Sequence, residues 1–250
     1  TDGHDYIDRA VYNRASVIVA QEGHLTGETR AFLASGKARY VTVKNSREAS
    51  AYIYDNKYGN PSKRLRLLAV TGTNGKTTTA YMLRAIFAEA GYNTALIGTT
   101  TGKLTTPDPD VLYGQMKDMA DGGAVYLAIE ASSHALALDK LAPCIFEVGI
   151  FTNLTPEHLD FHGTMENYCA AKAKLFEQSR IGIFNYDSDY GQKLYFSAPC
   201  DRYFYSVKSD AADYMALLPP ESRPVLEGVF ERGDKVALLG ASKTKKSFFL

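Results

Sequence analysis

The sequence predicts an α/β protein in which a small N-terminal α/β domain precedes a central domain built around a mostly parallel sheet. Three observations predict this fold. Short, uniformly apolar segments recur after Arg64, amphipathic helical patterns separate them, and one strand-to-helix connection is rich in Gly and Thr. Strands that are apolar on both faces are typical of parallel sheets. The repeated order of strand, turn and helix therefore favours a buried parallel sheet in the central domain.

Five apolar runs are the expected strands of that sheet. They lie at 65–70, 94–97, 125–129, 148–151 and 181–184. Three helices are expected between or after them, at 76–90, from Asp108 to the glycines at 122 and 123, and at 165–178. Two later runs, 203–207 and 235–239, are also strand-like, whereas 211–223 has no clear pattern.

The first 60 residues alternate short helical and strand patterns, which is typical of a small α/β domain. A helical pattern covers 6–13, and strand-like runs cover 16–20 and 40–43. A second helix begins at Ser46 and ends at the turn-rich residues 59–62. We therefore predict two domains, residues 1–62 and 63–250, the first of which starts at Thr1 as if preceding sequence had been removed.

Composition excludes several classes of partner. The chain has 28 basic and 28 acidic side chains, so no overall field draws it to nucleic acid or to an anionic membrane, and we expect neither partner. No apolar run approaches the roughly 20 residues that a membrane-spanning helix requires. The three cysteines are widely spaced and form no CxxC pair, which indicates reduced thiols. We expect a cytoplasmic monomer.

The strongest chemical pattern is TGTNGKTTT at 71–79, between an apolar strand and an amphipathic helix. Glycines allow backbone N–H groups to surround phosphate oxygens, and the helix N-terminus adds partial positive charge. Lys76 would reach the terminal phosphates of ATP, and the Thr77 hydroxyl would bind Mg²⁺. The pattern departs from GxxxxGK[ST] because Val70 occupies the first glycine position, and an ordinary Gly-rich turn is the alternative. The expected ATP-binding residues here are Gly72, Thr73, Asn74, Gly75, Lys76, Thr77 and Thr78.

Polar residues follow three of the expected strands, where an open parallel sheet binds its ligands. Glu130 is a candidate Mg²⁺ ligand, because this hard cation prefers a few oxygen donors, although a solvated strand-end acid is the alternative. Asn153 and Asn185 end two further strands and are candidate ATP-binding residues. Ser132, just after Glu130, could hold a polar substrate.

The segment 152–162 contains two histidines, His158 and His162. Their spacing could ligate zinc on a helix, but Pro156 and Gly163 argue against a long helix there. His158 is therefore read as a second Mg²⁺ ligand or a phosphate partner, and His162 as structural.

Lys172 falls on the apolar stripe of the helix expected at 165–178. A buried ammonium is costly, so its pKa should fall, and the neutral amine can react with CO₂ to give a carbamate that binds metal. The alternative is a lysine at the helix edge whose ammonium reaches solvent.

Several of these segments together resemble the Mur ligase family, specifically its UDP-N-acetylmuramoyl-tripeptide synthetases. The resemblance covers about residues 1–190 and rests on six motifs. They are DGHDYI (2–7), TGTNGKTTT (71–79), LTTPDP (104–109), EASSHAL (130–136), TNLTPEHLDFHGTMENYCAAKAKLF (152–176) and FNYD (184–187). It implies a central ATPase domain preceded by a domain that holds the UDP group.

The resemblance also implies a reaction and a set of site residues. A substrate γ-carboxylate attacks ATP, and the acyl phosphate is captured by the amine of L-Lys or meso-diaminopimelate. Lys76, Lys172 and His158 would be catalytic, with two Mg²⁺ ions bound through Thr77, Glu130, His158 and the carbamate of Lys172. The UDP-N-acetylmuramoyl dipeptide would contact Thr105, Thr106, Ser132 and Lys140.

The sequence departs from the family at several points. Lys140 stands where Arg is common, and Glu157 replaces the usual Asp. The family's C-terminal ligase domain, with its DNPR motif, finds no match, so we expect it to be absent. Three alternatives stay open: a fragment that binds ATP and the UDP-sugar peptide without turnover, another Mur-type ligase such as a cyanophycin synthetase-like enzyme, and a P-loop kinase.

Overall fold

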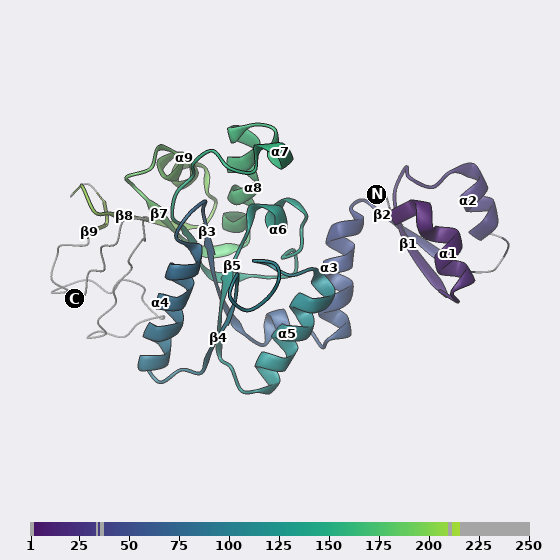
Figure 1. Ribbon diagram of the computed structural model, residues 1–250, viewed down its shortest axis with the longest axis horizontal. Helices are drawn as coiled ribbons and strands as arrows, with labels where there is room; N and C mark the ends of the chain where they lie inside the picture. Colours follow the sequence, from purple (N-terminus) through teal and green to yellow (C-terminus); the bar gives the residue numbers. More distant parts are fainter. Residues whose placement is uncertain (1–2, 34, 36–37, 210–211, 216–250) are drawn as a thin grey trace.

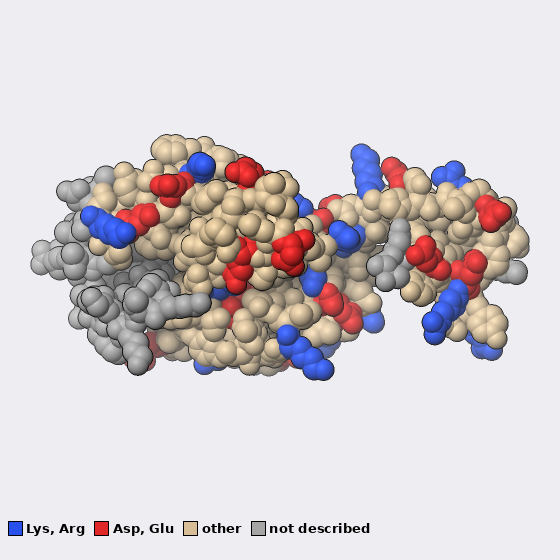
Figure 2. All heavy atoms as spheres, turned by 45° about the horizontal axis from the view of Figure 1, so that its top comes forward, with Lys and Arg blue, Asp and Glu red and all other residues tan. Residues whose placement is uncertain are grey.

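The computed structural model describes residues 3–33, 35, 38–209 and 212–215. Within them the chain forms a two-stranded parallel sheet near the N-terminus and a seven-stranded parallel sheet (Figure 1). The two sheets lie in separate lobes, and Figure 2 shows a narrow waist between them. The expected α/β fold with a mostly parallel sheet is confirmed.

The N-terminal lobe has one parallel strand pair with short helices beside it. Its elements are η1 (Gly3–Tyr6), α1 (Ile7–Tyr12), β1 (Val17–Gln21), α2 (Gly27–Phe32) and β2 (Arg39–Val43). Ile18 and Ala20 alternate with exposed valines along β1 and bury one face of the strand pair. They join Ile7 and Leu33 in a small core of their own.

Helix α3 (Ser46–Lys57) connects the two lobes. It begins at Asn45, whose side-chain oxygen accepts hydrogen bonds from the amides of Arg47 and Glu48. Ala51 is fully buried in the core of the larger lobe, against which α3 packs. The short helix η3 (Pro61–Lys63) follows. The domain division at residue 62 stays a prediction, and α3, which precedes it, packs with the larger lobe.

The seven strands of the central sheet run in the order β4-β5-β3-β6-β7-β8-β9, and every neighbouring pair is parallel. Their bounds are β3 Arg66–Thr71, β4 Thr94–Ile97, β5 Tyr126–Glu130, β6 Phe146–Phe151, β7 Ser179–Asn185, β8 Asp201–Ser206 and β9 Tyr214–Met215. The helices are α4 Lys76–Glu89, α5 Pro109–Asp121, α6 Ser133–Ala137, α7 Leu159–His162, α8 Met165–Glu177 and α9 Asp189–Ser197.

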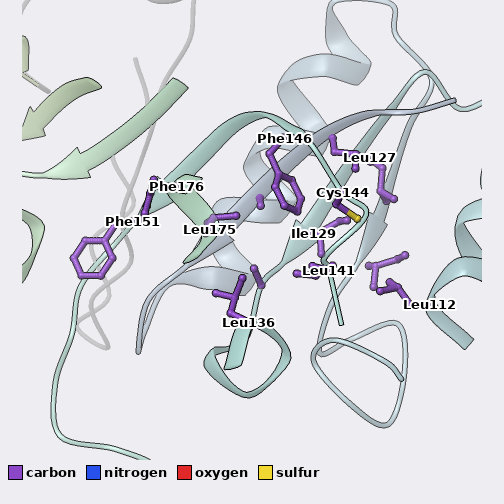
Figure 3. Packing of buried hydrophobic residues seen from close by; sticks show 14 of the residues in the cluster. Leu112, Leu127, Ile129, Leu136, Leu141, Cys144, Phe146, Phe151, Leu175 and Phe176 are labelled. Carbon is purple, nitrogen blue, oxygen red and sulfur yellow. The ribbon is translucent and has the colours of Figure 1, made fainter. Parts of the chain in front are cut away.

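Helices cover both faces of this sheet. Ala80, Leu83 and Phe87 of α4 pack on one face. The opposite face forms the larger core, to which α5, α6, α8 and α9 all contribute. Figure 3 shows Leu112 of α5, Leu136 of α6 and Leu175 of α8 in this core. Strand residues such as Leu67 and Ile129 are fully buried in it. Burial on both sides explains why the strands are uniformly apolar.

The expected strands and helices of the central sheet are confirmed, with ends that differ by one or two residues. The strand expected at 203–207 is β8. The strand expected at 235–239, and the segment 211–223 apart from 212–215, lie outside the described residues. Four short helices, α2, α6, α7 and α9, were not expected. Among the described residues, none of the helices has the length and apolar character needed to cross a membrane.

Candidate nucleotide-binding site

The Gly-rich segment leaves the centre of the sheet at the end of β3 and leads directly into α4. Gly72 and Gly75 have φ angles of 148° and 88°, in the range that favours glycine. A Cβ atom on Gly72 would also run into the Thr152 side chain at the end of β6. Both glycines are therefore required by the path of the loop.

The Lys76 ammonium lies inside the curve of this loop. Its Nζ donates to the carbonyl oxygens of Gly72 at 3.0 Å and Thr73 at 2.9 Å. Burial lowers the pKa of Lys76, partly offset by the negative charges of Glu130 and Glu157. The loop thus holds a cation at the position where the sequence predicts phosphate binding.

Lys172 approaches the same loop from α8. Its side chain is 1% exposed, so the alternative of a lysine at the helix edge is wrong. Nζ donates to the Gly72 carbonyl oxygen at 2.9 Å and lies 4.6 Å from the centre of the Tyr168 ring. Burial, and then the charge of Lys76, hold the pKa of Lys172 well below its usual range.

Glu130 meets the first turn of α4 at the end of β5. It is fully buried, so the alternative of a solvated acid is wrong. One carboxylate oxygen accepts from the Thr77 hydroxyl at 2.8 Å and from the Thr99 hydroxyl at 3.1 Å, and the other accepts from the Thr99 amide at 3.0 Å. The carboxylate and the Thr77 hydroxyl form a small, oxygen-only group beside the loop.

Residues just after β6 and at the end of β7 hold the loop in place. The Asn153 side chain accepts from the Asn74 amide at 3.0 Å and donates to the Asn74 carbonyl at 3.1 Å. The Thr152 hydroxyl donates to the same carbonyl at 2.7 Å, while Asn185 donates to the Thr152 carbonyl at 2.7 Å. In this structure both asparagines fix the loop.

The four expected substrate residues fall into two groups. The Thr106 hydroxyl donates to the Glu130 carbonyl at 2.7 Å, and its oxygen lies 3.1 Å from the Ser132 hydroxyl oxygen. The Thr105 and Thr99 hydroxyl oxygens are 3.1 Å apart. Thr105, Thr106 and Ser132 therefore extend the site from Glu130. Lys140 instead forms an ion pair of 2.6 Å with Asp108.

The His158 ring meets the Tyr168 ring edge-on, 6.3 Å between centroids, and Tyr168 also contacts Lys172. The half-exposed His158 ring is 4.9 Å from that of His134, between centroids. His162 is buried, bonds to the Ser133 hydroxyl at 2.9 Å and stacks on Tyr168, in keeping with a structural role. The short α7 explains why the two histidines do not share a long helical face.

Sequence reasoning missed three residues of this site. Thr99 follows β4, so the strand-end rule used for Glu130 would have found it. Thr152 is the first residue after β6. Tyr168 precedes Lys172 by one helical turn, and its hydroxyl lies 3.2 Å from that of Thr73. Thr152 and Tyr168 fall within the motif at 152–176, but no role was assigned to them, and their place in the fold reveals it.

A cavity of about 1000 Å³ lies on the N-terminal lobe and reaches the waist. It is lined by His4, His24, Lys44, Arg47 and, from the central lobe, Asp139. His4 accepts a hydrogen bond of 3.0 Å from the Gln21 amide through Nε2. Two of these side chains, Lys44 and Arg47, are cationic, and Asp139 is anionic.

A parallel sheet with a glycine loop, an inward lysine and a helix N-terminus at its central strand defines the class of P-loop nucleotide-binding proteins. The chain also matches the Mur ligase middle domain over residues 70–222. It therefore belongs to the Mur ligase family.

Curated relatives agree with this assignment. A UDP-N-acetylmuramoyl-L-alanyl-D-glutamate--2,6-diaminopimelate ligase of Clostridium tetani is 40% identical over 217 residues, which is 83% of this chain and 44% of that protein. A ligase of the same name from Parabacteroides distasonis is 35% identical over 94% of this chain and 48% of its own length. The chain thus spans about half the length of these relatives.

Solved structures agree on the fold. A structure of a UDP-N-acetylmuramoyl-L-alanyl-D-glutamate--2,6-diaminopimelate ligase matches 80% of this chain and 47% of its own, with a TM-score of 0.63 and 26% identity. A crystal structure of MurF from Acinetobacter baumannii has a TM-score of 0.53 at 17% identity, covering 88% of this chain and 46% of that one, which supports the fold alone.

Proposed function

We propose that this chain is the nucleotide- and UDP-substrate-binding part of an ATP-dependent ligase that adds 2,6-diaminopimelate to UDP-N-acetylmuramoyl-L-Ala-D-Glu. The family membership and the names of the relatives support the reaction and its substrates. The observation that carries the proposal is the loop between β3 and α4, with Lys76 inside it and Thr77 against Glu130. Its cytoplasmic location and monomeric state stay predictions.

The loop would bind the phosphates of ATP through its backbone amides and through Lys76. The Lys76 ammonium bonds to two backbone carbonyls, and a phosphate group would be a stronger partner because it is charged. The γ-carboxylate of the D-Glu residue would then attack the γ-phosphorus and release ADP. The amine of diaminopimelate would attack the acyl phosphate and release phosphate.

The group formed by Thr77 and Glu130 fits Mg²⁺. This ion is commonly bound by one or two protein oxygens together with substrate phosphates and water. In keeping with such a sparse site, the described part of the chain has no cluster of three or more His, Cys, Asp or Glu side chains suited to a metal. Bound Mg²⁺ would neutralise charge on the phosphates, with His158 as a proposed ligand of a second ion.

Lys172 is proposed to carry a carbamate. Its buried amine, with a lowered pKa, is more often neutral than an exposed lysine at the same pH. Its nitrogen lone pair can add to CO₂ with loss of one proton, which replaces a buried cation by an anion. That anion would lie beside Lys76 and could bind a metal ion.

The UDP group would occupy the cavity of the N-terminal lobe, where Lys44 and Arg47 match its diphosphate. The dipeptide end would reach Thr105, Thr106 and Ser132 next to Glu130. Lys140 is proposed to exchange Asp108 for a substrate anion.

The test is phosphate release by this chain, and by a longer protein that contains it, with ATP, Mg²⁺ and UDP-N-acetylmuramoyl-L-Ala-D-Glu. We expect release that depends on diaminopimelate and is much weaker with L-lysine. Product analysis showing a stable phosphoester would instead support a kinase. Binding of both nucleotide compounds without turnover by the longer protein would leave only a binding function.

A further inference from the structure

Asp139 follows helix α6, one residue beyond its C-cap Leu138, and has a left-handed backbone conformation. Its φ angle is 54°, in the left-handed region that few residues other than glycine adopt. Glycine at this position would hold the same conformation at a lower free-energy cost. Aspartate adopts this region more readily than most side chains do, and unlike glycine it carries a carboxylate that can bond to other residues.

The Asp139 carboxylate joins three parts of the molecule. One oxygen accepts from the Asn45 side-chain amide at 2.7 Å, and the other accepts from the Lys174 ammonium at 2.7 Å. Asn45 lies between β2 and α3 and uses its own oxygen to cap α3. Lys174 lies on α8, two residues after Lys172. One side chain therefore bonds to the N-terminal connection and to a helix of the candidate site.

The position of Asp139 places this contact between the two halves of the proposed substrate path. Asp139 itself lines the N-terminal cavity. The helix that Asp139 follows begins after Ser132, whose hydroxyl caps α6 and contacts Thr106. At the narrow waist seen in Figure 2, the Gln21 side chain of β1 also accepts hydrogen bonds from the Ser46 amide and hydroxyl, at 3.4 and 3.3 Å. The Tyr52 hydroxyl of α3 lies 3.4 Å from the Ala142 carbonyl and holds α3 against the larger lobe.

We infer that Asp139 is a positioning residue that, through its hydrogen bond with Asn45, fixes the N-terminal cavity in register with the site at the strand ends. This inference rests on the proposed function, in which one ligand fills both places. When one end of such a ligand is bound, the effective concentration of the other end depends on the spacing and stiffness between the two places. We call the contact between Asp139 and Asn45 the joint. Loosening this joint weakens the binding of a ligand that spans both places and leaves the binding of shorter ligands unaffected.

The first experiment compares D139G with R14G by titration calorimetry on the whole chain. Arg14 is also left-handed, at a φ of 67°, but it is exposed and distant in sequence from the joint, so R14G controls for backbone relief. The probes are UDP, a non-hydrolysable ATP analogue with Mg²⁺, and UDP-N-acetylmuramoyl-L-Ala-D-Glu. We expect D139G to bind the last about tenfold more weakly and the first two within twofold of the unaltered chain, with no loss of thermal stability.

A charge exchange tests the hydrogen bond itself. N45D places two carboxylates next to each other, and they repel. It should weaken the binding of the spanning ligand at least as much as D139G does. The double change N45D/D139N reverses donor and acceptor and should recover most of that affinity. If the two side chains acted only through packing, the double change would not recover affinity, because each single change also alters the packing around the joint.

Each result decides between the alternatives. Unchanged affinity of D139G for the spanning ligand, or no recovery in N45D/D139N, overturns the inference while the proposed function stands. An equal loss for UDP alone makes Asp139 a cavity contact and also overturns it. If the unaltered chain binds none of the three probes, the proposed function fails and this inference fails with it.

Discussion

Lys76 and Lys172 donate hydrogen bonds to the same atom, the carbonyl oxygen of Gly72, at 3.0 and 2.9 Å. One lysine comes from the first turn of α4 and the other from the buried side of α8. Two ammonium groups on one carbonyl repel each other, and each lowers its free energy if it loses its proton or gains an anion. The site is therefore prepared for negative charge.

Removing the Lys76 side chain should weaken nucleotide binding selectively. We expect K76A to raise the Kd for a Mg²⁺-ATP analogue at least tenfold, or about 1.4 kcal/mol, because the phosphates lose their nearest cation. Affinity for UDP should not change. K117A, which removes an exposed lysine of α5, is the control. Equal ATP affinity of K76A and K117A would contradict the role of the loop.

Replacing Lys172 by Met should stabilise the fold in a pH-dependent way. Below its lowered folded-state pKa, the lysine is charged in both states and the burial cost is complete. Between that pKa and the ordinary value of 10.5, only the unfolded chain holds the proton, so the unfolding free energy of the unaltered chain rises with pH. The advantage of K172M should therefore shrink as the pH approaches 10.5.

Denaturant titrations in CO₂-free buffer at several pH values measure this difference. K193M, on the exposed side of α9, controls for the loss of a lysine. If the difference in unfolding free energy between K172M and the unaltered chain did not change with pH, Lys172 would keep its proton in the folded state. In a complete ligase, K172A should lose activity and regain part of it with added short carboxylates.

Glu130 should carry the Mg²⁺ dependence of nucleotide binding. We expect E130Q to bind the metal-free ATP analogue within about threefold of the unaltered chain but to lose the tightening caused by Mg²⁺. The amide would also face the Thr77 and Thr99 donors, with a stability loss of about 1–3 kcal/mol. The control is E147Q, which changes a carboxylate elsewhere in the sheet. If Mg²⁺ tightens binding equally in E130Q and E147Q, Glu130 is not a metal ligand.

Gly72 should tolerate no side chain. In G72A the added methyl group would point at Thr152, and alanine would have to adopt a conformation that glycine prefers. Gly91 has a φ of 85° but open space around it, so G91A tests the conformation alone. We expect G91A to lose about 1–3 kcal/mol of stability and G72A to lose more, together with ATP binding. Chemical denaturation and calorimetry measure both. Similar losses in the two variants would mean that the approach of Thr152 does not constrain the loop.

Much of the site could be predicted from local patterns. The loop follows from glycine spacing between a strand and a helix, and buried Lys172 follows from its place on an apolar helical stripe. Glu130 follows from the strand-end rule. Each of these depends on residues near one another in the sequence.

The contacts across the sheet could not be predicted in this way. Thr152 and Asn153 brace Asn74 from 78 and 79 residues away, and no periodicity encodes that contact. Asp139 shows no motif, because its role depends on a backbone angle and on Asn45, which is 94 residues distant. The helices α6 and α7 have only five and four residues, too few for a periodic signal.

The most direct test is the structure of this chain with Mg²⁺ and a non-hydrolysable ATP analogue. We predict that the terminal phosphates lie against the backbone amides at the start of α4 and that the Lys76 ammonium leaves the Gly72 carbonyl to bind them. A nucleotide bound elsewhere, or a Lys76 that keeps both carbonyl partners while ATP is bound, would contradict the account.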